Sequence, residues 1–124
     1  MSDNSKKVLI VDDNEGLRKL LSLTLKSTSF QLLEAENGED ALRMTESHLP
    51  DVVLLDVMMP GSMDGYQTCS AIKNNPKLSN TKVYILSARA QKADLEAGKQ
   101  AGADHYLTKP FSPVELLKLL QSKG

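Results

Sequence analysis

The sequence predicts an α/β fold of the doubly wound kind, built on a five-stranded parallel sheet with the strand order 2-1-3-4-5. Five short apolar segments alternate with five segments of helical periodicity, and such alternation produces a parallel sheet with right-handed crossovers and helices on both faces. The first, third and fourth apolar segments are the most uniformly apolar, which is typical of strands buried on both faces. We therefore place these three at the centre of the sheet and the second and fifth at its edges.

Composition and charge restrict the class of protein. The 124 residues are enough for one domain with its own core, and we expect residues 1–124 to form a single domain. The formal net charge of −1, with both signs interspersed, gives no basic stripe for nucleic acid and no basic patch for a membrane. The single cysteine, Cys69, excludes an internal disulfide, and no apolar run approaches the roughly 18–20 residues of a membrane span. These features predict a cytoplasmic protein whose domain contacts neither nucleic acid nor membrane.

The N-terminal half contains three of the strands. Its predicted elements are, in order, strand 8–11, helix 14–27, strand 30–35, helix 37–47 and strand 51–56. Four leucines of the first helix are expected on its inner face: Leu17, Leu20, Leu21 and Leu25. The central strand is the run Asp51-Val-Val-Leu-Leu-Asp56, which ends before Pro60. A carboxylate at the C-terminal end of a central parallel strand lies where open α/β sheets place their functional groups.

The C-terminal half continues the alternation. Its predicted elements are, in order, helix 64–74, a polar connection at 75–80, strand 82–87, helix 90–101, strand 104–108 and a last helix ending near 121. The helix at 90–101 has a stripe of small residues: Ala90, Ala93, Ala97 and Ala101. Alanines bury little apolar area, so this helix is expected to be the least firmly anchored. The complete pattern is that of a (βα)5 flavodoxin-like fold.

Polar side chains follow four of the predicted strands. Asp12 and Asp13 follow the first strand, and Asp56, Ser87 and Lys109 lie at the ends of the third, fourth and fifth. In the predicted strand order these ends share one rim of the sheet. Three carboxylates close together repel one another, so they favour a divalent cation, and all-oxygen ligands suit Mg²⁺ or Mn²⁺ rather than zinc.

The two histidines are not placed to join this site. His48 is expected at the end of a helix and His105 on an edge strand. Lys109 would instead supply a fixed positive charge opposite the carboxylates, and Ser87 a hydroxyl donor. A metal, a lysine and a hydroxyl could surround the oxygens of a phosphoryl group while an aspartate attacks the phosphorus.

Taken together, these segments give the sequence a family resemblance. It resembles a response-regulator receiver domain of bacterial two-component systems over essentially its whole length. The segments that carry the resemblance are Val8-Leu-Ile-Val-Asp-Asp13, Leu54-Leu-Asp-Val-Met-Met-Pro60, Met63-Asp-Gly65, Ile85-Leu-Ser-Ala88, Gly102-Ala-Asp-His-Tyr106 and Thr108-Lys-Pro-Phe111. Each segment alone is weakly specific, whereas all of them in register are highly specific.

The resemblance implies a chemical role for several residues. Asp56 would accept a phosphoryl group from a phosphohistidine on a sensor histidine kinase or a histidine phosphotransfer protein, without turnover of an external substrate. Mg²⁺ would be bound by Asp13, Asp56 and the backbone carbonyl of Met58, with Asp12 reaching it through water. Ser87, Lys109 and Tyr106 would be the switch hydroxyl, the conserved lysine and the switch aromatic, and the bond between Lys109 and Pro110 would be cis.

A signalling output is also expected. Phosphorylation would be read out on the surface formed by the fourth helix, the fifth strand and the fifth helix, with the ring of Tyr106 moving inward from a solvent-facing position. The leucines of the last helix, at 116, 117, 119 and 120, occupy more than one side and predict a surface patch for a downstream partner, an effector domain or a second copy of the chain. Sequence does not separate a stand-alone regulator from a receiver within a longer protein.

The sequence departs from the family pattern at one place. The family's loop usually reads Pro-x-Met-Asp-Gly, whereas residues 60–65 here are Pro-Gly-Ser-Met-Asp-Gly, one residue longer. The extra residue lies beyond Met58, so metal binding is expected to survive, while the shape of the loop stays open.

Three other interpretations remain. A metal-dependent phosphohydrolase would need an acid two residues after Asp56, where this chain has Met58. A flavodoxin-like flavin carrier would need a phosphate-binding loop after the first strand, where Asp12 and Asp13 would repel phosphate. A receiver that no longer accepts phosphate would be expected to lack a chemical group, and none is missing.

Overall fold

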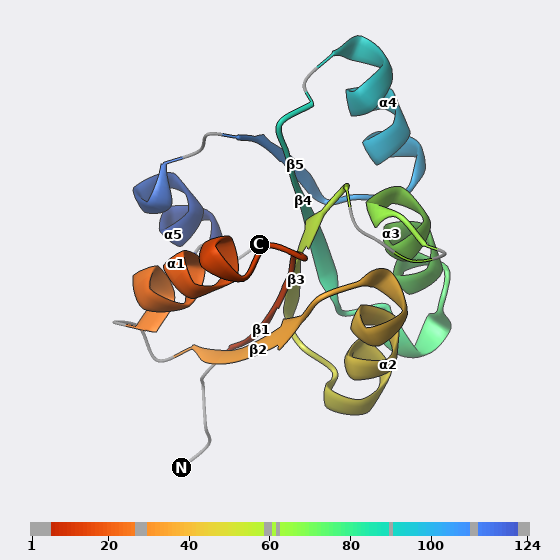
Figure 1. The fold of residues 1–124 in the computed structure, drawn as a ribbon. Helices are drawn as coiled ribbons and strands as arrows, with labels where there is room; N and C mark the ends of the chain where they lie inside the picture. The colour runs from red at the N-terminus through yellow and green to blue at the C-terminus, as the bar shows by residue number, and fades with distance from the viewer. Residues whose placement is uncertain are drawn as a thin grey trace.

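A computed structural model describes residues 6–26, 30–58, 61, 63–89, 91–109 and 112–121 (Figure 1). Its five parallel strands have the order β2-β1-β3-β4-β5, which confirms the predicted topology. The strands are β1 (Lys7–Val11), β2 (Gln31–Ala35), β3 (Val52–Asp56), β4 (Lys82–Ser87) and β5 (His105–Thr108). The helices are α1 (Glu15–Lys26), α2 (Gly38–His48), α3 (Gly65–Lys73), α4 (Lys92–Gln100) and α5 (Pro113–Gln121), with a 3₁₀-helix η1 (Pro76–Leu78).

The helices cover the sheet from both sides. Figure 1 shows α1 and α5 together on one face and α2, α3 and α4 on the other. Successive residues of a strand point to opposite faces, so the central strands feed two separate cores. In β1, for example, Val8 and Ile10 pack under α1 and α5, while Leu9 and Val11 pack under α2 and α3. This double burial explains why the central strands are continuous apolar runs.

The edge strands are more exposed, as predicted. In β2 only Ala35 is buried, and in β5 no residue is fully buried. His105 lies on β5, exposed, with its ring edge-on to Tyr84 at a centroid distance of 4.8 Å. His48 is exposed at the end of α2. Neither histidine lies in the acidic cluster described below.

The inner face of α1 differs from the prediction. Leu21 and Leu25 are buried as expected, but Leu20 is 54% exposed and Arg18 is buried in its place. At 3.6 residues per turn, Leu20 lies about 100° around the helix from Leu21, whereas Arg18 lies on the same side as Leu21 and Leu25. The helical period, rather than residue type, therefore decides which side chain faces the sheet.

Two further segments differ from expectation. The predicted polar connection at 75–80 contains η1, whose Leu78 is only 1% exposed and belongs to the core. In α4 the alanine stripe is weaker than expected, because Ala93 is exposed and the one buried residue of the helix is Gly98. Ala90 lies outside the described residues. The small buried surface of α4 agrees with its expected weak anchoring.

Helix α5 buries one pair of its leucines completely. Leu116 and Leu120 are 0% exposed, while Leu117 and Leu119 are partly buried against the same core. The predicted leucine patch is therefore reduced, and among the side chains of this helix that the structure describes, the large exposed apolar one is Val114.

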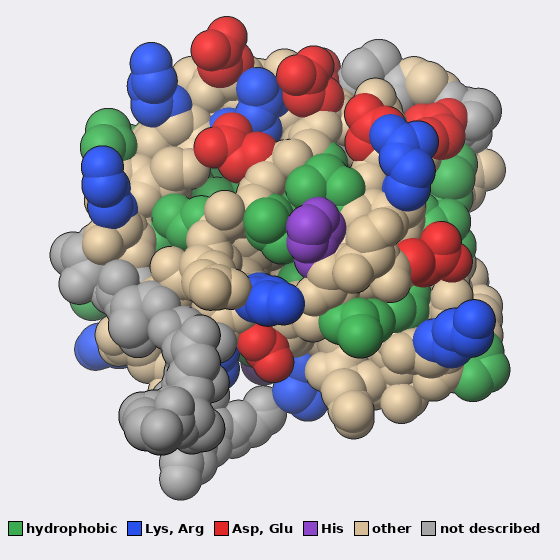
Figure 2. All heavy atoms as spheres, turned by 90° about the horizontal axis from the view of Figure 1, so that it is seen from below, with side chains coloured by type: hydrophobic (Ala, Val, Ile, Leu, Met, Phe, Trp, Pro, Cys, Tyr) green, Lys and Arg blue, Asp and Glu red, His purple; other side chains and the backbone are tan. Residues whose placement is uncertain are grey.

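The surface shows no single-sign charged region on the face drawn in Figure 2, where acidic and basic side chains are interspersed. Within the described ranges, no helix combines the length and the hydropathy that crossing a bilayer requires.

Candidate functional site

The sheet register brings the polar strand ends together. Val11 of β1 pairs with Leu55 of β3, so Asp12 and Asp56 leave neighbouring strands side by side. On the other side of β3, Asp56 pairs with Leu86, and Ser87 follows directly. The fifth strand ends at Thr108, opposite Ser87, and Lys109 comes next.

Three carboxylates and one ammonium group meet at this edge. One oxygen from each of Asp12, Asp13 and Asp56 lies within 4.8 Å of the others. Lys109 reaches into the cluster, with its Nζ 3.3 Å from Asp12 Oδ2 and 3.2 Å from Asp56 Oδ1. Asp12 and Asp56 are 3% and 7% exposed, whereas Asp13 is exposed to solvent. The site thus combines a buried acidic pair with one accessible acid.

The environment of Asp56 disfavours its charged form. Burial is the largest cause that raises the pKa of this carboxyl above its ordinary value, and repulsion from Asp12 adds to it. Lys109 acts in the opposite direction through its charge and its hydrogen bond, and a backbone hydrogen bond at Val57 does the same. One lysine does not fully offset the burial and the second carboxylate, so a further cation near the cluster would stabilise ionised Asp56.

Asp12 is held through its backbone and its side chain. Its N–H donates to the carbonyl of Ala35 at 3.1 Å, and its carbonyl accepts from Arg18 Nη1 at 2.7 Å. Its Oδ1 accepts the backbone N–H of Asn14 at 2.9 Å, and its Oδ2 accepts from Lys109. Both carboxylate oxygens are therefore already engaged by protein donors.

Arg18 is the residue at this site that the sequence analysis missed. A signal was present, because the helical period places position 18 on the same face as Leu21 and Leu25. A basic residue on an inner helix face requires buried partners, and these partners become visible only in the folded structure.

The end of β4 is fixed by short-range contacts. Ser87 is 1% exposed, and its Oγ accepts the backbone N–H of Arg89 at 2.9 Å. The carbonyl of Ser87 accepts the backbone N–H of Lys109 at 2.7 Å, which ties the lysine's backbone to the neighbouring strand. Ser87 therefore lies next to the cluster along the rim, with its hydroxyl engaged by its own loop.

Helix α3 begins directly against Asp56. The N–H of Gly65 donates to the carbonyl of Val57 at 2.9 Å. A methyl group on Gly65 would lie 2.4 Å from the Asp56 carbonyl oxygen and 2.6 Å from Val57 Cα, so only glycine fits. Asp64 caps this helix in a reciprocal capping box with Gln67.

The longer loop is only partly described. Met59, Pro60 and Ser62 lie outside the described residues, as does the predicted cis bond at Pro110. Gly61 has a φ of 101°, and a methyl group there would lie 2.9 Å from Glu39 Oε1. Two glycines of this loop, Gly61 and Gly65, thus lie close to α2 and to the end of β3.

The ring of Tyr106 does not project into solvent as expected. It is partly buried above Gly98 of α4, where an added methyl group would lie 2.7 Å from the ring. Its hydroxyl donates to the carbonyl of Arg89 at 3.0 Å and lies 3.1 Å from the hydroxyl of Tyr66. Tyr66 is in turn 3.2 Å from the carbonyl of Asp94. The aromatic ring therefore already has an inward site in this structure.

The donor set fits a hard divalent cation. The clustered ligand atoms are all carboxylate oxygens, and no histidine or cysteine of the described residues joins them. Oxygen-only ligands of this kind suit Mg²⁺ or Mn²⁺, which usually retain several water ligands. Exposed Asp13 leaves room for such waters, whereas zinc would be expected with nitrogen or sulfur ligands.

Fold and site together define an open α/β protein with an acidic, lysine-containing site at the carboxyl ends of its central strands. Residues 8–121 match the model of the response regulator receiver domain, so the chain belongs to the response regulator receiver family of two-component signalling. Proteins of this family are signalling proteins that generally bind Mg²⁺ and interact with sensor histidine kinases and effector domains.

Known proteins show the same similarity. The chain is 39% identical to the protein PilG of Pseudomonas aeruginosa over 94% of this chain and 85% of that protein. It is 37% identical to the alkaline phosphatase synthesis transcriptional regulatory protein PhoP of Bacillus subtilis over 90% of this chain, but only 45% of that protein. The structure of the chemotaxis response regulator CheY4 of Vibrio cholerae matches with a TM-score of 0.87 at 33% identity, covering 95% of this chain and 98% of that one. Apart from PilG, the first matched curated relatives are about twice as long as this chain.

Proposed function

We propose that residues 1–124 act as a single phosphoacceptor domain in which Asp56 takes a phosphoryl group from a phosphohistidine in the presence of Mg²⁺. The donor would be a sensor histidine kinase or a histidine phosphotransfer protein. The observation that carries the proposal is the cluster of Asp12, Asp13 and Asp56 with Lys109 in contact with two of them.

The proposed reaction moves one phosphoryl group. A carboxylate oxygen of Asp56 attacks the phosphorus, the phosphorus–nitrogen bond breaks, and its electron pair returns to the imidazole of the donor. When bound, Mg²⁺ supplies positive charge that neutralises the oxygens of the phosphoryl group. Lys109 adds a fixed positive charge at the same place, and Ser87, at the end of the strand next to β3, offers a hydroxyl to a phosphoryl oxygen.

The proposed metal site has three direct ligands and one ligand that acts through water. Asp13 and Asp56, with the backbone carbonyl of Met58, are the proposed direct ligands. Asp12 is the proposed indirect ligand, which acts through water. Support for this assignment comes from the hydrogen bonds that already engage both carboxylate oxygens of Asp12.

No feature of the described residues favours the two enzymatic or carrier alternatives. The position that a phosphohydrolase would give to an acid is occupied by Met58, which is 59% exposed and has no proton to donate. The turn after β1, where a flavin carrier would bind phosphate, carries Asp12 and Asp13.

The proposal is tested by labelling the protein with a small-molecule phosphodonor. We expect one acid-labile phosphoryl group per chain when Mg²⁺ is present, and almost none after a chelator has been added. Labelling that is independent of the metal would contradict the proposed role of the cluster.

Replacing Met58 by asparagine is expected to shorten the lifetime of the phosphorylated protein. Hydrolysis needs a water in line with the bond between Asp56 and phosphorus, and Met58 is exposed beside Asp56 but cannot orient water. Arg89 is turned toward α4, where its Nη1 lies 3.8 Å from Asp94 Oδ1, and it is not a base. A positioned amide should speed the loss of phosphate by up to about 100-fold, the effect of a change of about 1 Å in the position of a reacting group.

The measurement is the decay of labelled protein after the donor has been removed. Met58→Leu is the matched control, because it changes shape without adding a hydrogen-bonding group. Equal or slower decay of Met58→Asn would show that this position does not limit access of water.

We further propose that phosphorylation is read out on the surface of α4, β5 and α5 through Tyr106. The ring occupies its inward site even while Ser87 Oγ is bonded to its own loop, so the inward site does not require the hydroxyl to move first. We infer that phosphorylation raises the population of this inward arrangement rather than creating it. Helix α4, with its small buried surface, is the element that moves most easily.

The hydroxyls of Tyr66 and Tyr106 share too few protons for their contacts. Three contacts compete for two hydroxyl hydrogens. Tyr106 contacts the carbonyl of Arg89, Tyr66 contacts the carbonyl of Asp94, and the two hydroxyls contact each other. Only two of these contacts can be hydrogen bonds at one time. If the loop at Arg89 moves, Tyr106 can donate to Tyr66, which then donates to Asp94, so Tyr66 can hold the ring inward in either arrangement.

Replacing Tyr66 by phenylalanine is therefore expected to weaken the switch. The loss of about 1 kcal/mol of hydrogen bonding should reduce the affinity for the phosphoryl mimic beryllofluoride by up to about 5-fold. Backbone amide shifts with and without the mimic should change at Tyr106 and over residues 91–101 in the wild type. Tyr84→Phe, on the opposite face of the sheet, is the matched control. Shift changes confined to the acidic cluster would rule out this read-out.

A further inference from the structure

Arg18 of α1 is a buried basic side chain next to the candidate metal site. Among the described residues it is the only Lys or Arg in the buried class, with 10% of its side chain exposed. Burying a guanidinium is costly unless its hydrogens are paired. The groups that pair with the Arg18 guanidinium therefore indicate the role of this side chain.

The contacts of Arg18 run in two directions. Toward the sheet edge, Nε lies 3.0 Å from Glu34 Oε1 and Nη2 lies 3.9 Å from Glu36 Oε2. Toward the site, Nη1 donates to the backbone carbonyl of Asp12 at 2.7 Å in a buried hydrogen bond. The planar guanidinium can donate to Glu34 and to the Asp12 carbonyl at the same time.

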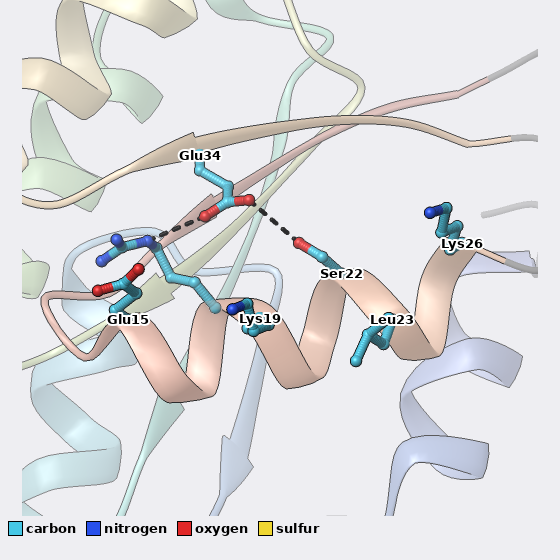
Figure 3. Close-up of a pocket in the computed structure, with 7 residues that line it drawn as sticks. Glu15, Lys19, Ser22, Leu23, Lys26 and Glu34 are labelled. Atoms are coloured by element: carbon cyan, nitrogen blue, oxygen red, sulfur yellow. Dashed lines mark hydrogen bonds and ion pairs between the residues drawn. The ribbon is translucent and has the colours of Figure 1, made fainter.

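Glu34 is itself held in place from α1. Figure 3 shows Glu34 facing α1 across a shallow groove, with Ser22 Oγ donating to Glu34 Oε2 at 3.2 Å. Arg18 therefore rests on a carboxylate that β2 and α1 both fix. The guanidinium is thus held by a buried hydrogen bond to the Asp12 carbonyl and by its contact with Glu34, whose side chain is 46% exposed.

The carbonyl that Arg18 holds belongs to the peptide bond between Asp12 and Asp13. Asp13 is exposed, and its carboxylate accepts no hydrogen bond from any described residue. The direction of its side chain consequently depends on its backbone, and the Asp12 carbonyl oxygen is one of the six coplanar atoms of the peptide that precedes Asp13. Fixing this carbonyl fixes the direction in which Asp13 leaves the strand.

We propose that Arg18 is a positioning residue for the metal site, which orients the peptide between Asp12 and Asp13 so that the Asp13 carboxylate can ligate a divalent cation. This proposal rests on the proposed function of the acidic cluster. Arg18 touches neither the cation nor the phosphoryl group, and it acts only through the backbone of Asp12.

The positioning role and a purely electrostatic role predict opposite results. A positive charge near a cation site weakens cation binding, so removing the charge alone should tighten it. Removing a group that orients a ligand should weaken binding, by about 10-fold or more for residues that support metal ligands. The sign of the change in affinity distinguishes the two.

The test uses Mn²⁺ as the probe and the unphosphorylated protein without any phosphodonor. The dissociation constant is measured from the signal of free Mn²⁺ in electron paramagnetic resonance. We expect Arg18→Gln to raise this constant about 10-fold or more. Lys19→Gln, which removes the same charge from an exposed position of the same helix, should leave it unchanged or slightly lower. Urea unfolding in the presence of a chelator checks that each variant is folded.

Each outcome decides the proposal. Equal or tighter binding by folded Arg18→Gln would overturn it. If Arg18→Gln does not fold, Arg18→Lys takes its place. Lysine keeps the charge, but it lacks the planar fork that lets arginine donate to the Asp12 carbonyl and to Glu34 at the same time. Weaker Mn²⁺ binding by this variant would support the proposal, and unchanged binding would overturn it. Wild-type protein that does not bind Mn²⁺, or binds it equally well after Asp13→Asn, would overturn the proposed metal site itself together with the role of Arg18.

Discussion

Asp56→Asn is expected to lower phosphoryl incorporation from a small-molecule donor to below about 1% of the wild-type level, because the amide lacks the nucleophilic oxygen that would attack the phosphorus. The substitution preserves the shape of the side chain, so the sheet and its helices should be unaffected. Asp51→Asn is the matched control, since Asp51 is an exposed acid just before the other end of β3 and accepts the backbone N–H of Lys7. Labelling of Asp56→Asn at the wild-type level would exclude Asp56 as the phosphoacceptor.

The same variant should be more stable than the wild type when the metal has been removed. Burial and the neighbouring Asp12 raise the pKa of Asp56, so its ionised form destabilises the folded state at neutral pH. Asparagine carries no charge and avoids this cost. As the pH falls through the raised pKa, wild-type Asp56 becomes protonated, so the stability difference should shrink. Urea unfolding in a chelator at several pH values measures it, and a variant less stable than the wild type at neutral pH would contradict the expected repulsion.

Mg²⁺ should reverse this order of stability. A ligand that binds only the folded state stabilises it by about 2.7 kcal/mol at a concentration 100 times its dissociation constant. The wild type should gain this stabilisation, whereas Asp56→Asn has lost a proposed ligand and should gain less. Without the metal, Asp56→Asn should therefore be the more stable protein, and with Mg²⁺ the wild type should be the more stable one.

The topology and the main groups of the site could be predicted from sequence because they depend on patterns with a short period. Runs such as Val52–Leu55 are apolar at every position only where both faces of a strand are covered, which placed β1, β3 and β4 at the centre of the sheet. Once the strand order was fixed, the clustering of Asp12, Asp56 and Lys109 followed, because parallel strands end at the same rim.

The residues that escaped prediction depend on contacts between elements. Arg18 can stay buried on the inner face of α1 because Glu34 on β2 and the Asp12 carbonyl accept its hydrogens. Tyr106 lies inward because Gly98 leaves room for its ring and Tyr66 presents a hydroxyl. The helical period indicates the inner position of Arg18, but neither propensity nor spacing identifies the groups that these side chains contact.

Gly65→Ala is the second change expected to have a large effect, because it would place a methyl group inside the backbone that carries the phosphoacceptor. The added carbon would lie 2.4 Å from the Asp56 carbonyl oxygen and 2.6 Å from Val57 Cα. Both are backbone atoms at the end of a fully buried strand, and they cannot rotate away as a side chain could. Either α3 or the end of β3 must move.

The expected loss of stability is about 1–3 kcal/mol, the usual cost of overpacking a well-packed interior. Gly16→Ala is the matched control. Its added methyl group would meet only the side chain of Asn14, at 3.2 Å, and replacing glycine by alanine at a compatible position stabilises a protein by about 0.4–1 kcal/mol. The control should therefore be neutral or slightly stabilising, which separates the clash at Gly65 from any general effect of replacing glycine.

Phosphorylation should suffer more from Gly65→Ala than stability does. A displacement of about 1 Å in a reacting group can reduce a rate by about 100-fold, because the geometry of attack depends on its position. We therefore expect folded Gly65→Ala to be labelled roughly 100 times more slowly than the wild type under the same conditions, with Gly16→Ala unchanged. Labelling at the wild-type rate by a destabilised Gly65→Ala would mean that α3 absorbs the whole displacement. In that case the close approach of Gly65 serves to anchor α3, and the position of Asp56 is set by the strands on either side of it.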